Sequence, residues 1–488
     1  MAYQDPAGYT GPIGGHPEPP RASPAGAATP AMQLQLQLDW SAFDSYGQGD
    51  AYADLPLHGE GFGKAAALCI GSRQCQKGAA DKGLMCPSFR ATNEDLHSTR
   101  GRAAALRQAL NGELGATPFV DGQLDAAMDL CVACKGCKRE CPNGVDMAAL
   151  RAETLAQRWA AGQPMPLRTR FVAGLPQWLP RLRPLRWAIA LRNRLPLLAR
   201  AMERTLGVAA RRSLPLPAAR PFVMPAEPAA HSATALREVV LLVDCFATHL
   251  EPAVADAAVA LLRSQGYRVL GLDADGAAPL CCGRTAYSAG LIGQARAQAG
   301  RLIAALAPHV AAGRAIVGLE PSCLTMLRDE AHQLGLDAEQ VQAVAKASLM
   351  LEEFLARELD AKRWSPALPA PATAPVLVHG HCHQKAFGTL KAMRKVLGAL
   401  PGLQVEWIES SCCGMAGSFG YEAEHVDMSM RMAELSLLPA VRAAAPDAWV
   451  LASGTSCRHQ IQDGAQRGSL HLAQVLQRLL APATGPAR

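Results

Sequence analysis

The stretch CVACKGCKRECP, Cys131 to Pro142, contains four cysteines at the spacing C-x2-C-x2-C-x3-C and ends in Cys-Pro. A run of this kind directs its first three thiolates to one iron-sulfur cluster, and its turn carries the fourth thiolate toward a second cluster. Cys131, Cys134 and Cys137 therefore need a fourth ligand from elsewhere in the chain. Cys141 in turn needs a cluster other than theirs.

An incomplete run of the same type precedes this stretch, in LCIGSRQC (68–75) and MCPSF (85–89). Cys69 and Cys75 are spaced like the first and third cysteines of a complete run, and Ser72 stands at the middle position. Cys86 supplies a Cys-Pro end after an insertion. Reciprocal pairing of the two runs then predicts a complete [4Fe-4S] cluster held by Cys86, Cys131, Cys134 and Cys137.

The second predicted site has only three cysteines, Cys69, Cys75 and Cys141. It fits a [3Fe-4S] cluster, a four-iron cluster with one non-thiolate ligand, or no cluster, in which case the thiols are buried as small apolar residues. Structural zinc is disfavoured at both sites, because a zinc ion takes four closed ligands and leaves the two Cys-Pro ends unexplained.

An internal repeat dominates the rest of the chain. The first copy contains VVLLVDC (239–245), CCG (281–283) and EPSC (320–323), and the second contains VLVHGHC (376–382), CCG (412–414) and GTSC (454–457). Helical patterns separate the apolar strands, so each copy predicts a parallel sheet whose loops converge at the carboxyl ends of its strands. At that edge we expect two metal-binding sets to form, Cys245, Cys281, Cys282 and Cys323 in the first copy and Cys382, Cys412, Cys413 and Cys457 in the second.

Adjacent cysteines suit bridged or unusual iron-sulfur clusters better than a single tetrahedral ion, and redox-active thiols are the alternative. The glycines at 283, 414, 417 and 420 are expected to let backbone N–H groups approach the cluster sulfurs. His379, His381 and His383 surround Cys382 and, with Lys385, are candidates to bind iron or to shuttle a proton. The alternative for each histidine is a satisfied polar group at the end of a strand.

These patterns predict an α/β plus α fold, in which a helical ferredoxin-like domain precedes two repeated α/β CCG domains with parallel sheets. The expected parts are a mostly disordered N-terminal segment (1–60), the helical iron-sulfur domain (61–160), an Arg-rich helical connector (161–235), and the two CCG domains (236–365 and 366–488).

Two local patterns add detail near the N-terminus. Residues 1 to about 31 are rich in Pro, Gly and Ala and are predicted to be disordered. LQLQLDW (34–40) alternates with period two, which predicts a half-buried strand, either at a sheet edge or as a docking strand for a partner. In STRGRAAALRQALNG (98–112), Ser98 is the expected cap at the start of a helix and Asn111-Gly112 its end.

The net charge of +6 is concentrated in one segment, because residues 164–215 contain eleven arginines and a single acid, Glu203. Prolines divide this segment into short predicted helices. A basic amphipathic segment suits an anionic membrane surface, and a solvated connector that packs on its neighbours is the equally weighted alternative. No nucleic-acid-binding motif accompanies the charge, so no nucleic-acid partner is expected.

The composition is that of a globular chain, with 488 residues and 49 % hydrophobic content. No run of about 18 apolar residues and no signal-peptide pattern is present, so we expect a cytoplasmic protein that contacts a membrane at most peripherally, at its inner face. The fifteen cysteines lie in short-spaced runs, which metal binding in a reducing compartment explains better than disulfides.

The two CCG motifs with their flanking cysteines resemble the cysteine-rich domains shared by the heterodisulfide reductase B subunit and the iron-sulfur subunits of glycolate oxidase and anaerobic glycerol-3-phosphate dehydrogenase. MCPSFRATNEDLHSTRGRA, CVACKGCKRECPNGVDM, HGHCHQKA, CCGMAGSFGYE and GTSCRHQI more closely resemble the C-terminal half of FAD-linked D-2-hydroxyacid dehydrogenases. The similarity extends from about Gly61 to Leu480. The heterodisulfide reductase pattern ends each copy in C-x2-C. In this chain the first of those two cysteines is replaced, by Glu320 in the first copy and by Gly454 in the second.

The resemblance implies an iron-sulfur electron-transfer subunit of a 2-hydroxyacid dehydrogenase of the glycolate, D-lactate or 2-hydroxyglutarate type. A separate FAD-binding subunit would be its partner, since no dinucleotide fingerprint is present and no FAD is expected in this chain. A quinone or another carrier would accept the electrons. The alternative is a heterodisulfide-reductase-like catalyst of thiol and disulfide chemistry, which Glu320 and Gly454 disfavour because each replaces a ligand. Purely structural thiols are the least favoured interpretation.

Overall fold

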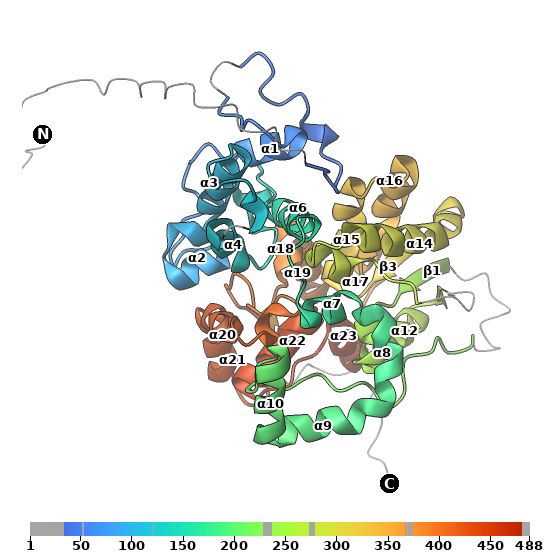
Figure 1. Ribbon diagram of the computed structural model, residues 1–488. Helices are drawn as coiled ribbons and strands as arrows, with labels where there is room; N and C mark the ends of the chain where they lie inside the picture. The colour runs from blue at the N-terminus through green and yellow to red at the C-terminus, as the bar shows by residue number, and fades with distance from the viewer. Residues whose placement is uncertain are drawn as a thin grey trace, which may run out of the picture. The chain divides into compact units, whose positions relative to one another are not determined.

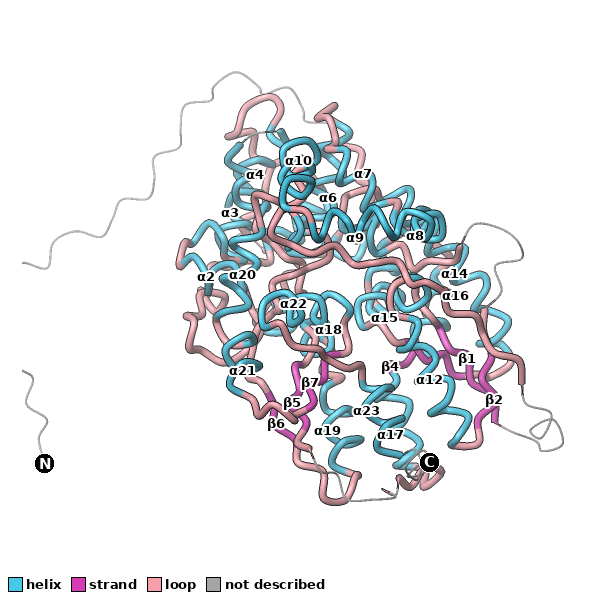
Figure 2. The backbone as a smooth tube through the Cα atoms, turned by 90° about the horizontal axis from the view of Figure 1, so that it is seen from below, coloured by secondary structure: helices cyan, strands magenta, loops and turns pink. Residues whose placement is uncertain are grey.

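Two parallel sheets carry the loops and helix starts in which the repeated cysteines lie (Figures 1 and 2). The structure is a computed structural model that describes residues 34–50, 53–120, 122–227, 237–272, 279–366, 368 and 374–480. One sheet has the strand order β2-β1-β3-β4 and the other β6-β5-β7, and the strand pairs are parallel. The strands are β1 (Arg237–Leu242), β2 (Tyr267–Leu270), β3 (Ala315–Gly318), β4 (Ser348–Met350), β5 (Val376–His379), β6 (Val405–Trp407) and β7 (Trp449–Ala452).

The register of the sheets makes the two copies directly comparable. β1 lies between β2 and β3, and β5 lies between β6 and β7. The last residue of β1, Leu242, pairs with Gly318, and the last residue of β5, His379, pairs with Ala452. Leu242 and His379 therefore occupy equivalent positions in the two copies. The strand β4 is an addition to the first copy that the repeat did not predict.

The helices of the two copies pack into a common hydrophobic core, in which α12 contacts α23 and α17 contacts α19. Buried aliphatic side chains of both sheets, such as Val239 and Val378, belong to this core. The first copy contains α11 (Cys245–His249), α12 (Pro252–Ser264), α13 (Arg284–Ser288), α14 (Ile292–Ala311), α15 (Pro321–Arg328), the 3-10 helix η6 (Glu330–Gln333), α16 (Ala338–Ala347) and α17 (Leu351–Asp360). The second contains α18 (Cys382–Ala386), α19 (Leu390–Gly398), η7 (Phe419–Tyr421), α20 (Val426–Glu434), α21 (Leu437–Ala443), α22 (Thr455–Ala465) and α23 (Leu472–Leu480).

The part before the repeat is helical, as predicted, and the mixed α/β and helical fold class is confirmed. Ser98 caps α3 by accepting the N–H of Gly101 at 3.0 Å, and α3 ends at Leu110, next to the expected Asn111. The elements of this part are η1 (Ser41–Phe43), α1 (Glu60–Ala67), α2 (Pro87–Thr92), η2 (Asp95–His97), α3 (Thr99–Leu110), η3 (Pro118–Val120), α4 (Gly122–Asp129), α5 (Gly136–Glu140) and α6 (Met147–Ala160).

The strand predicted at 34–40 is wrong, because this segment pairs with no strand. Its backbone instead binds the buried carboxylate of Glu153 on α6, which accepts the N–H groups of Gln37 at 2.9 Å and Leu38 at 2.8 Å. The indole of Trp40 donates to the same carboxylate at 3.1 Å. The alternating pattern thus reflects burial of Leu38 and Trp40 against helices. The predicted disorder of residues 1 to 31 lies outside the described residues.

The Arg-rich segment forms short helices, as predicted, and they follow one another along the chain in Figure 1. Within the described residues, no helix is both long enough and apolar enough to span a bilayer. Near the end of the segment, the buried guanidinium of Arg212 donates to the Gly420 carbonyl at 2.9 Å and to Gln460 at 2.6 Å in the second copy. The helices are α7 (Leu167–Ala173), α8 (Leu175–Leu182), η4 (Arg183–Leu185), α9 (Arg186–Arg194) and α10 (Pro196–Leu206).

Candidate metal centres

Four thiols of the helical part line one small cavity between α2, α3 and α5. They come from the loop before α2, the loop after α4 and the start of α5, and they are Cys86, Cys131, Cys134 and Cys137. The loop bends tightly around them, with positive φ angles of 46° at Ala133 and 62° at Lys135. The sequence grouped these four cysteines as one ligand set, and the structure brings them to one place.

The electrostatics of this cavity disfavour thiolates in the absence of a bound cation. Burial raises the pKa of Cys134 well above its usual value, and the neighbouring Cys382 adds to the rise. Burial, together with the charge of Asp146, raises the pKa of Cys137 to about 12. A metal centre whose iron atoms bind the sulfurs removes this cost, because the thiolate is the form that coordinates. The donor set therefore fits an iron-sulfur cluster.

The N-terminus of α3 forms part of this site, a feature that the sequence analysis did not recognise. The Thr99 N–H donates to the Cys86 sulfur at 3.1 Å, and the Thr99 hydroxyl lies 3.0 Å from the same sulfur. Ser98 and the Arg100 backbone hydrogen-bond to Cys75 and help to lower its pKa, although the contact with Cys86 is the larger cause. The capping pattern at Ser98 was the available signal, since a helix start presents N–H groups that favour anionic sulfur.

The three-cysteine set lies beside the complete one. The Cys69 thiol has a raised pKa, chiefly from burial, and the charges of Cys75 and Cys141 act on it. Cys75 also contacts Cys86, which lowers the Cys75 pKa to about 6 and raises that of Cys86. Ser72 is exposed to solvent. The two ferredoxin-type sets are therefore neighbours, joined through Cys75 and Cys86.

The first CCG copy also brings its four thiols together. Cys245 begins α11, Cys281 and Cys282 precede α13, and Cys323 lies in the first turn of α15. Side-chain hydrogen bonds connect Cys245 to Cys281, Cys281 to Cys282, and Cys282 to Cys323. Acidic groups border this set. Burial and the nearby Glu320 raise the pKa of Asp244 to about 7.

The second CCG copy has the same arrangement of Cys382, Cys412, Cys413 and Cys457, with basic groups in place of acidic ones. A hydrogen bond from Cys412 lowers the pKa of Cys382 well below its usual value, and the His381 ring contributes. Lys385 is half-buried and donates from Nζ to the Ser410 hydroxyl at 2.9 Å and to the Ser411 carbonyl at 3.0 Å. The two copies thus share one thiol arrangement, with Asp244 beside the first cysteine of one copy and His381 at the equivalent position in the other.

The predicted approach of backbone N–H groups to sulfur is found at two of the four glycines. Gly283 and Gly414 donate to the sulfurs of Cys281 and Cys412, each at 3.4 Å. Both have positive φ angles, 86° and 81°, and a Cβ atom at Gly414 would lie 2.4 Å from the Ser429 carbonyl oxygen. Glycine is therefore required here both for its backbone conformation and for lack of space.

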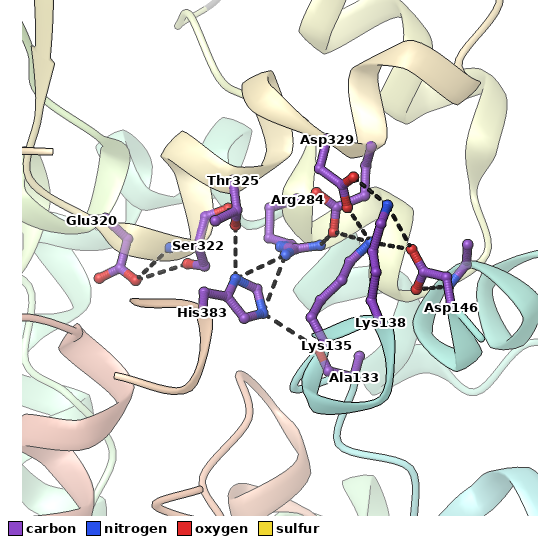
Figure 3. Close-up of polar contacts among 12 residues, drawn as sticks. Ala133, Lys135, Lys138, Asp146, Arg284, Glu320, Ser322, Thr325, Asp329 and His383 are labelled. Atoms are coloured by element: carbon purple, nitrogen blue, oxygen red, sulfur yellow. Dashed lines mark hydrogen bonds and ion pairs between the residues drawn. The ribbon is translucent and has the colours of Figure 1, made fainter. Parts of the chain in front are cut away.

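His383 connects three of these regions (Figure 3). Its Nδ1 lies 2.7 Å from the Thr325 hydroxyl and 3.2 Å from Arg284, both in the first CCG copy. Its Nε2 lies 3.3 Å from the carbonyl oxygen of Ala133, between two cysteines of the helical part. His383 itself follows Cys382, so this ring bridges the second copy to both other regions.

A buried ion network beside His383 joins the helical part to the first copy (Figure 3). The fully buried Lys135 ammonium lies 2.9 Å from Asp146 and 2.6 Å from Asp329. It also lies 3.3 Å from Glu330, which pairs with Arg284. Burial opposes the charge of Lys135, but these three carboxylates outweigh it and raise its pKa well above the usual value. The network holds the loop of Cys134 and Cys137 against α15 and η6.

Glu320 and Gly454 stand where the heterodisulfide reductase pattern has a cysteine, and the structure shows a contact that each of them makes or permits. Glu320 accepts the Ser322 hydroxyl at 2.7 Å and the Thr455 N–H at 2.9 Å, so its carboxylate links the two copies. A Cβ atom at Gly454 would lie 2.3 Å from Cδ2 of His381. A side chain at 454 is therefore excluded unless the His381 ring moves.

Comparison with known proteins decides the nature of these thiol sites. A family model described as a 4Fe-4S dicluster domain matches residues 65–145, and one described as a cysteine-rich domain matches residues 239–328 and 376–462. The chain carries an iron-sulfur dicluster domain and two cysteine-rich domains. The CCG copies defined above are these cysteine-rich domains.

The relatives of the chain include dehydrogenases and the iron-sulfur subunit of an oxidase. D-2-hydroxyglutarate dehydrogenase of Pantoea ananatis (strain AJ13355) is 24 % identical over 94 % of this chain and 48 % of its own length. Glycolate oxidase iron-sulfur subunit of Escherichia coli (strain K12) is 24 % identical over 81 % of this chain and 91 % of its own length. One of the subunits of anaerobic glycerol-3-phosphate dehydrogenase from the same strain is 25 % identical over 52 % of this chain and 62 % of its own length. The chain spans about half the length of the D-2-hydroxyglutarate dehydrogenases that it matches.

The cofactors of the chain are therefore iron-sulfur clusters, in agreement with the cysteine patterns. The assignment of individual ligands stays a prediction. Cys86, Cys131, Cys134 and Cys137 would hold a [4Fe-4S] cluster, the three-cysteine set a smaller or incomplete one, and the two cysteine-rich domains one centre each.

Proposed function

We propose that the chain receives electrons from a separate FAD-binding subunit that oxidises a 2-hydroxy acid, and passes them singly to a quinone or another carrier. The glycolate oxidase iron-sulfur subunit supports this proposal, because its similarity to this chain covers nearly its whole length. The D-2-hydroxyglutarate dehydrogenases support the class of substrate. The sequence contains no dinucleotide fingerprint, so the hydride acceptor would belong to the partner.

The observation that carries the proposal is the continuity of the thiol sets. Cys75 contacts Cys86, and Cys382 is close enough to Cys134 for its charge to raise the pKa of the Cys134 thiol. Glu320 bridges the two cysteine-rich domains by a hydrogen bond to Thr455, and its charge acts on the thiol of Cys323 as well as that of Cys457. Isolated structural sites have no reason to form such a series. An electron relay requires one.

The residues of the chain would perform three tasks in this relay. The buried thiols hold the cofactors apart from water, the Lys135 network fixes the loop of Cys134 against the first cysteine-rich domain, and His383 fixes the same loop against Cys382. The bound iron-sulfur clusters supply one-electron oxidation and reduction. For each 2-hydroxy acid oxidised to a 2-oxo acid, two electrons would pass through the chain one after the other, and one quinone would take up both with two protons.

The test uses the anaerobically purified chain with photochemically reduced FMN as donor and a water-soluble benzoquinone as acceptor. We expect reduced FMN to bleach the visible absorbance of the chain and the quinone to restore it. Cys134→Ala should slow the overall transfer by at least about tenfold, whereas Cys141→Ala should remove only the electrons stored at the three-cysteine set. Equal transfer in Cys134→Ala and the unchanged chain would overturn the relay.

The chain alone should not oxidise glycolate, D-lactate or D-2-hydroxyglutarate with a dye acceptor. Oxidation should require the flavoprotein that co-purifies with the tagged chain. Turnover without a flavoprotein contradicts the proposed division of labour. Reduction of a mixed disulfide by the reduced chain would favour the alternative function, thiol and disulfide chemistry at the paired cysteines.

The Arg-rich segment offers a contact surface for an anionic membrane, where a membrane quinone is reached. Leu167, Trp187 and Leu197 expose 69 %, 68 % and 78 % of their area, beside arginines of the same helices. Exposed leucine and tryptophan next to basic residues match the polar and apolar parts of a lipid interface. Binding to vesicles with and without phosphatidylglycerol tests this surface. Trp187→Ala with Leu197→Ala should weaken binding to the anionic vesicles, and equal binding by the double variant would exclude the surface.

A further inference from the structure

One buried ring nitrogen near the second cysteine-rich domain has no nitrogen or oxygen partner among the described residues, and the thiol of Cys413 lies within hydrogen-bonding reach of its ring. It is Nε2 of His379, the last residue of β5, whose side chain is inaccessible to solvent. Nδ1 of the same ring lies 2.9 Å from the Ser410 hydroxyl. A ring nitrogen of His379 and the sulfurs of Cys413 and Cys457 all lie within 4.8 Å of one another. A buried nitrogen whose one neighbour is a weakly bonding thiol is costly unless something binds it more strongly.

The other two histidines around this centre use their acceptor nitrogen in hydrogen bonds. Nδ1 of His381 accepts the backbone N–H of His383 at 3.1 Å, so the ring proton of neutral His381 is on Nε2. His383 uses Nδ1 toward Thr325 and Nε2 toward the Ala133 carbonyl. His381 Nδ1 also lies 3.9 Å from the sulfur of Cys382, but it accepts the His383 N–H. Of the three rings, His379 is therefore the one with a lone pair left for a metal.

The two copies differ at the positions that matter for ligation. Leu242 stands in the first copy where His379 stands in the second, because each is the last residue of the central strand and pairs with the last residue of the same neighbour. The second copy also has no room for a side chain at Gly454, where His381 fills the space. In the second copy, therefore, His381 excludes a ligand side chain at position 454, and His379 offers a ring nitrogen instead.

We propose that His379 Nε2 is an iron ligand of the cluster in the second cysteine-rich domain, together with thiolates from Cys382, Cys412, Cys413 and Cys457. The first domain, with Leu242 at the same position, has no nitrogen ligand. Imidazole is a borderline ligand that suits iron. It is neutral where a thiolate is anionic, so it raises the reduction potential of the second centre.

Ser410 and Lys385 support this role as positioning residues. A histidine that binds a metal normally donates its other ring N–H to an acceptor, which fixes its tautomer and orientation. The Ser410 hydroxyl oxygen is that acceptor for Nδ1, and its second lone pair receives the Lys385 ammonium at 2.9 Å. Lys385 also donates to the Ser410 carbonyl, so the serine is held from both sides.

The test is pulsed EPR of the reduced chain, with and without selective ¹⁵N labelling of histidine. We expect a hyperfine coupling from a histidine nitrogen that changes with the isotope and disappears in His379→Leu, which copies the first domain. His381→Asn is the matched control. Asp244 caps α11 at the equivalent position in the first copy, so asparagine preserves the cap and should preserve the coupling. His379→Cys should keep the cluster and lower its potential.

Three results would each overturn the inference. They are the absence of a histidine coupling in the unchanged chain, a coupling that survives in His379→Leu, and zinc in place of iron at this centre by metal analysis. The signal of the complete ferredoxin-type site should persist in every variant and shows that the chain is folded. The inference rests on the iron-sulfur cofactors and not on the proposed electron donor or acceptor, since the measurement detects ligation and not turnover.

Discussion

Replacing Lys135 by methionine should loosen the contact between the helical part and the first cysteine-rich domain. The substitution removes a fully buried ammonium from Asp146 at 2.9 Å, Asp329 at 2.6 Å and Glu330 at 3.3 Å, while it keeps most of the side-chain volume. Removing one partner of a buried ion pair costs about 3–5 kcal/mol, because a buried charge is left uncompensated.

The expected cost lies near the lower limit of that range. Lys138 still pairs with Asp146 at 3.2 Å and with Asp329, and Arg284 still pairs with Glu330. A loss of about 3 kcal/mol corresponds to a roughly hundredfold easier local opening. Hydrogen exchange should therefore be about a hundredfold faster in peptides that contain α15, η6 and the start of α6, and unchanged in α23.

Lys138→Met is the matched control, because this neighbour pairs with the same two aspartates but is 40 % exposed. Exposed ion pairs contribute about 0–1 kcal/mol, so exchange should rise only a few-fold. The variants must be compared at equal iron content, since loss of a cluster also loosens the site. Equal exchange in the two variants would refute the argument that burial gives the Lys135 network its strength.

Three further predictions concern the remaining sites. Ser72→Cys should add about one iron per chain at the three-cysteine set and replace any oxidised-state EPR signal there by a reduced-state one. An unchanged iron content and an unchanged spectrum would argue against a cluster at that set. The pKa of His425 is raised to about 9, because hydrogen bonds with its two carboxylate partners outweigh burial. The stabilisation by this pairing is complete below pH of about 6.5 and is lost as pH rises through about 9. NMR of ¹⁵N-histidine-labelled protein should therefore find a resonance that titrates near 9 and is absent from His425→Gln. A midpoint near 6.5 would contradict the pairing. Gly454→Ala should lower the melting temperature, because overpacking against His381 costs about 1–3 kcal/mol of stability. Gly468→Ala should be close to neutral, since a Cβ atom there meets nothing within 4 Å. Equal melting of the two variants would show that His381 moves freely.

The sequence predicted well wherever chemistry depends on spacing along the chain. The repeated strand, Cys-Cys-Gly and helix pattern was sufficient for two parallel sheets with their cysteines at one edge, because a parallel strand order places all the following loops on the same side. Ser98 and Asn111 marked the ends of α3 for a similar reason, since capping depends on neighbours a few residues away. The strand at 34–40 failed because its period-two pattern records burial alone, and Glu153, more than a hundred residues away, supplies the hydrogen bonds that a strand would need.

The sequence by itself thus determined which cysteines fall into local groups with iron-sulfur spacing. Only the tertiary structure decided how those groups face one another. The Lys135 network, the bridge of His383 to Ala133 and the approach of the His379 ring to Cys413 and Cys457 depend on packing between elements that are distant in the chain. Three histidines around one cysteine look alike in sequence, and they differ because each ring nitrogen meets a different partner. Hydrogen bonds between distant residues assign those partners, and no local pattern encodes them.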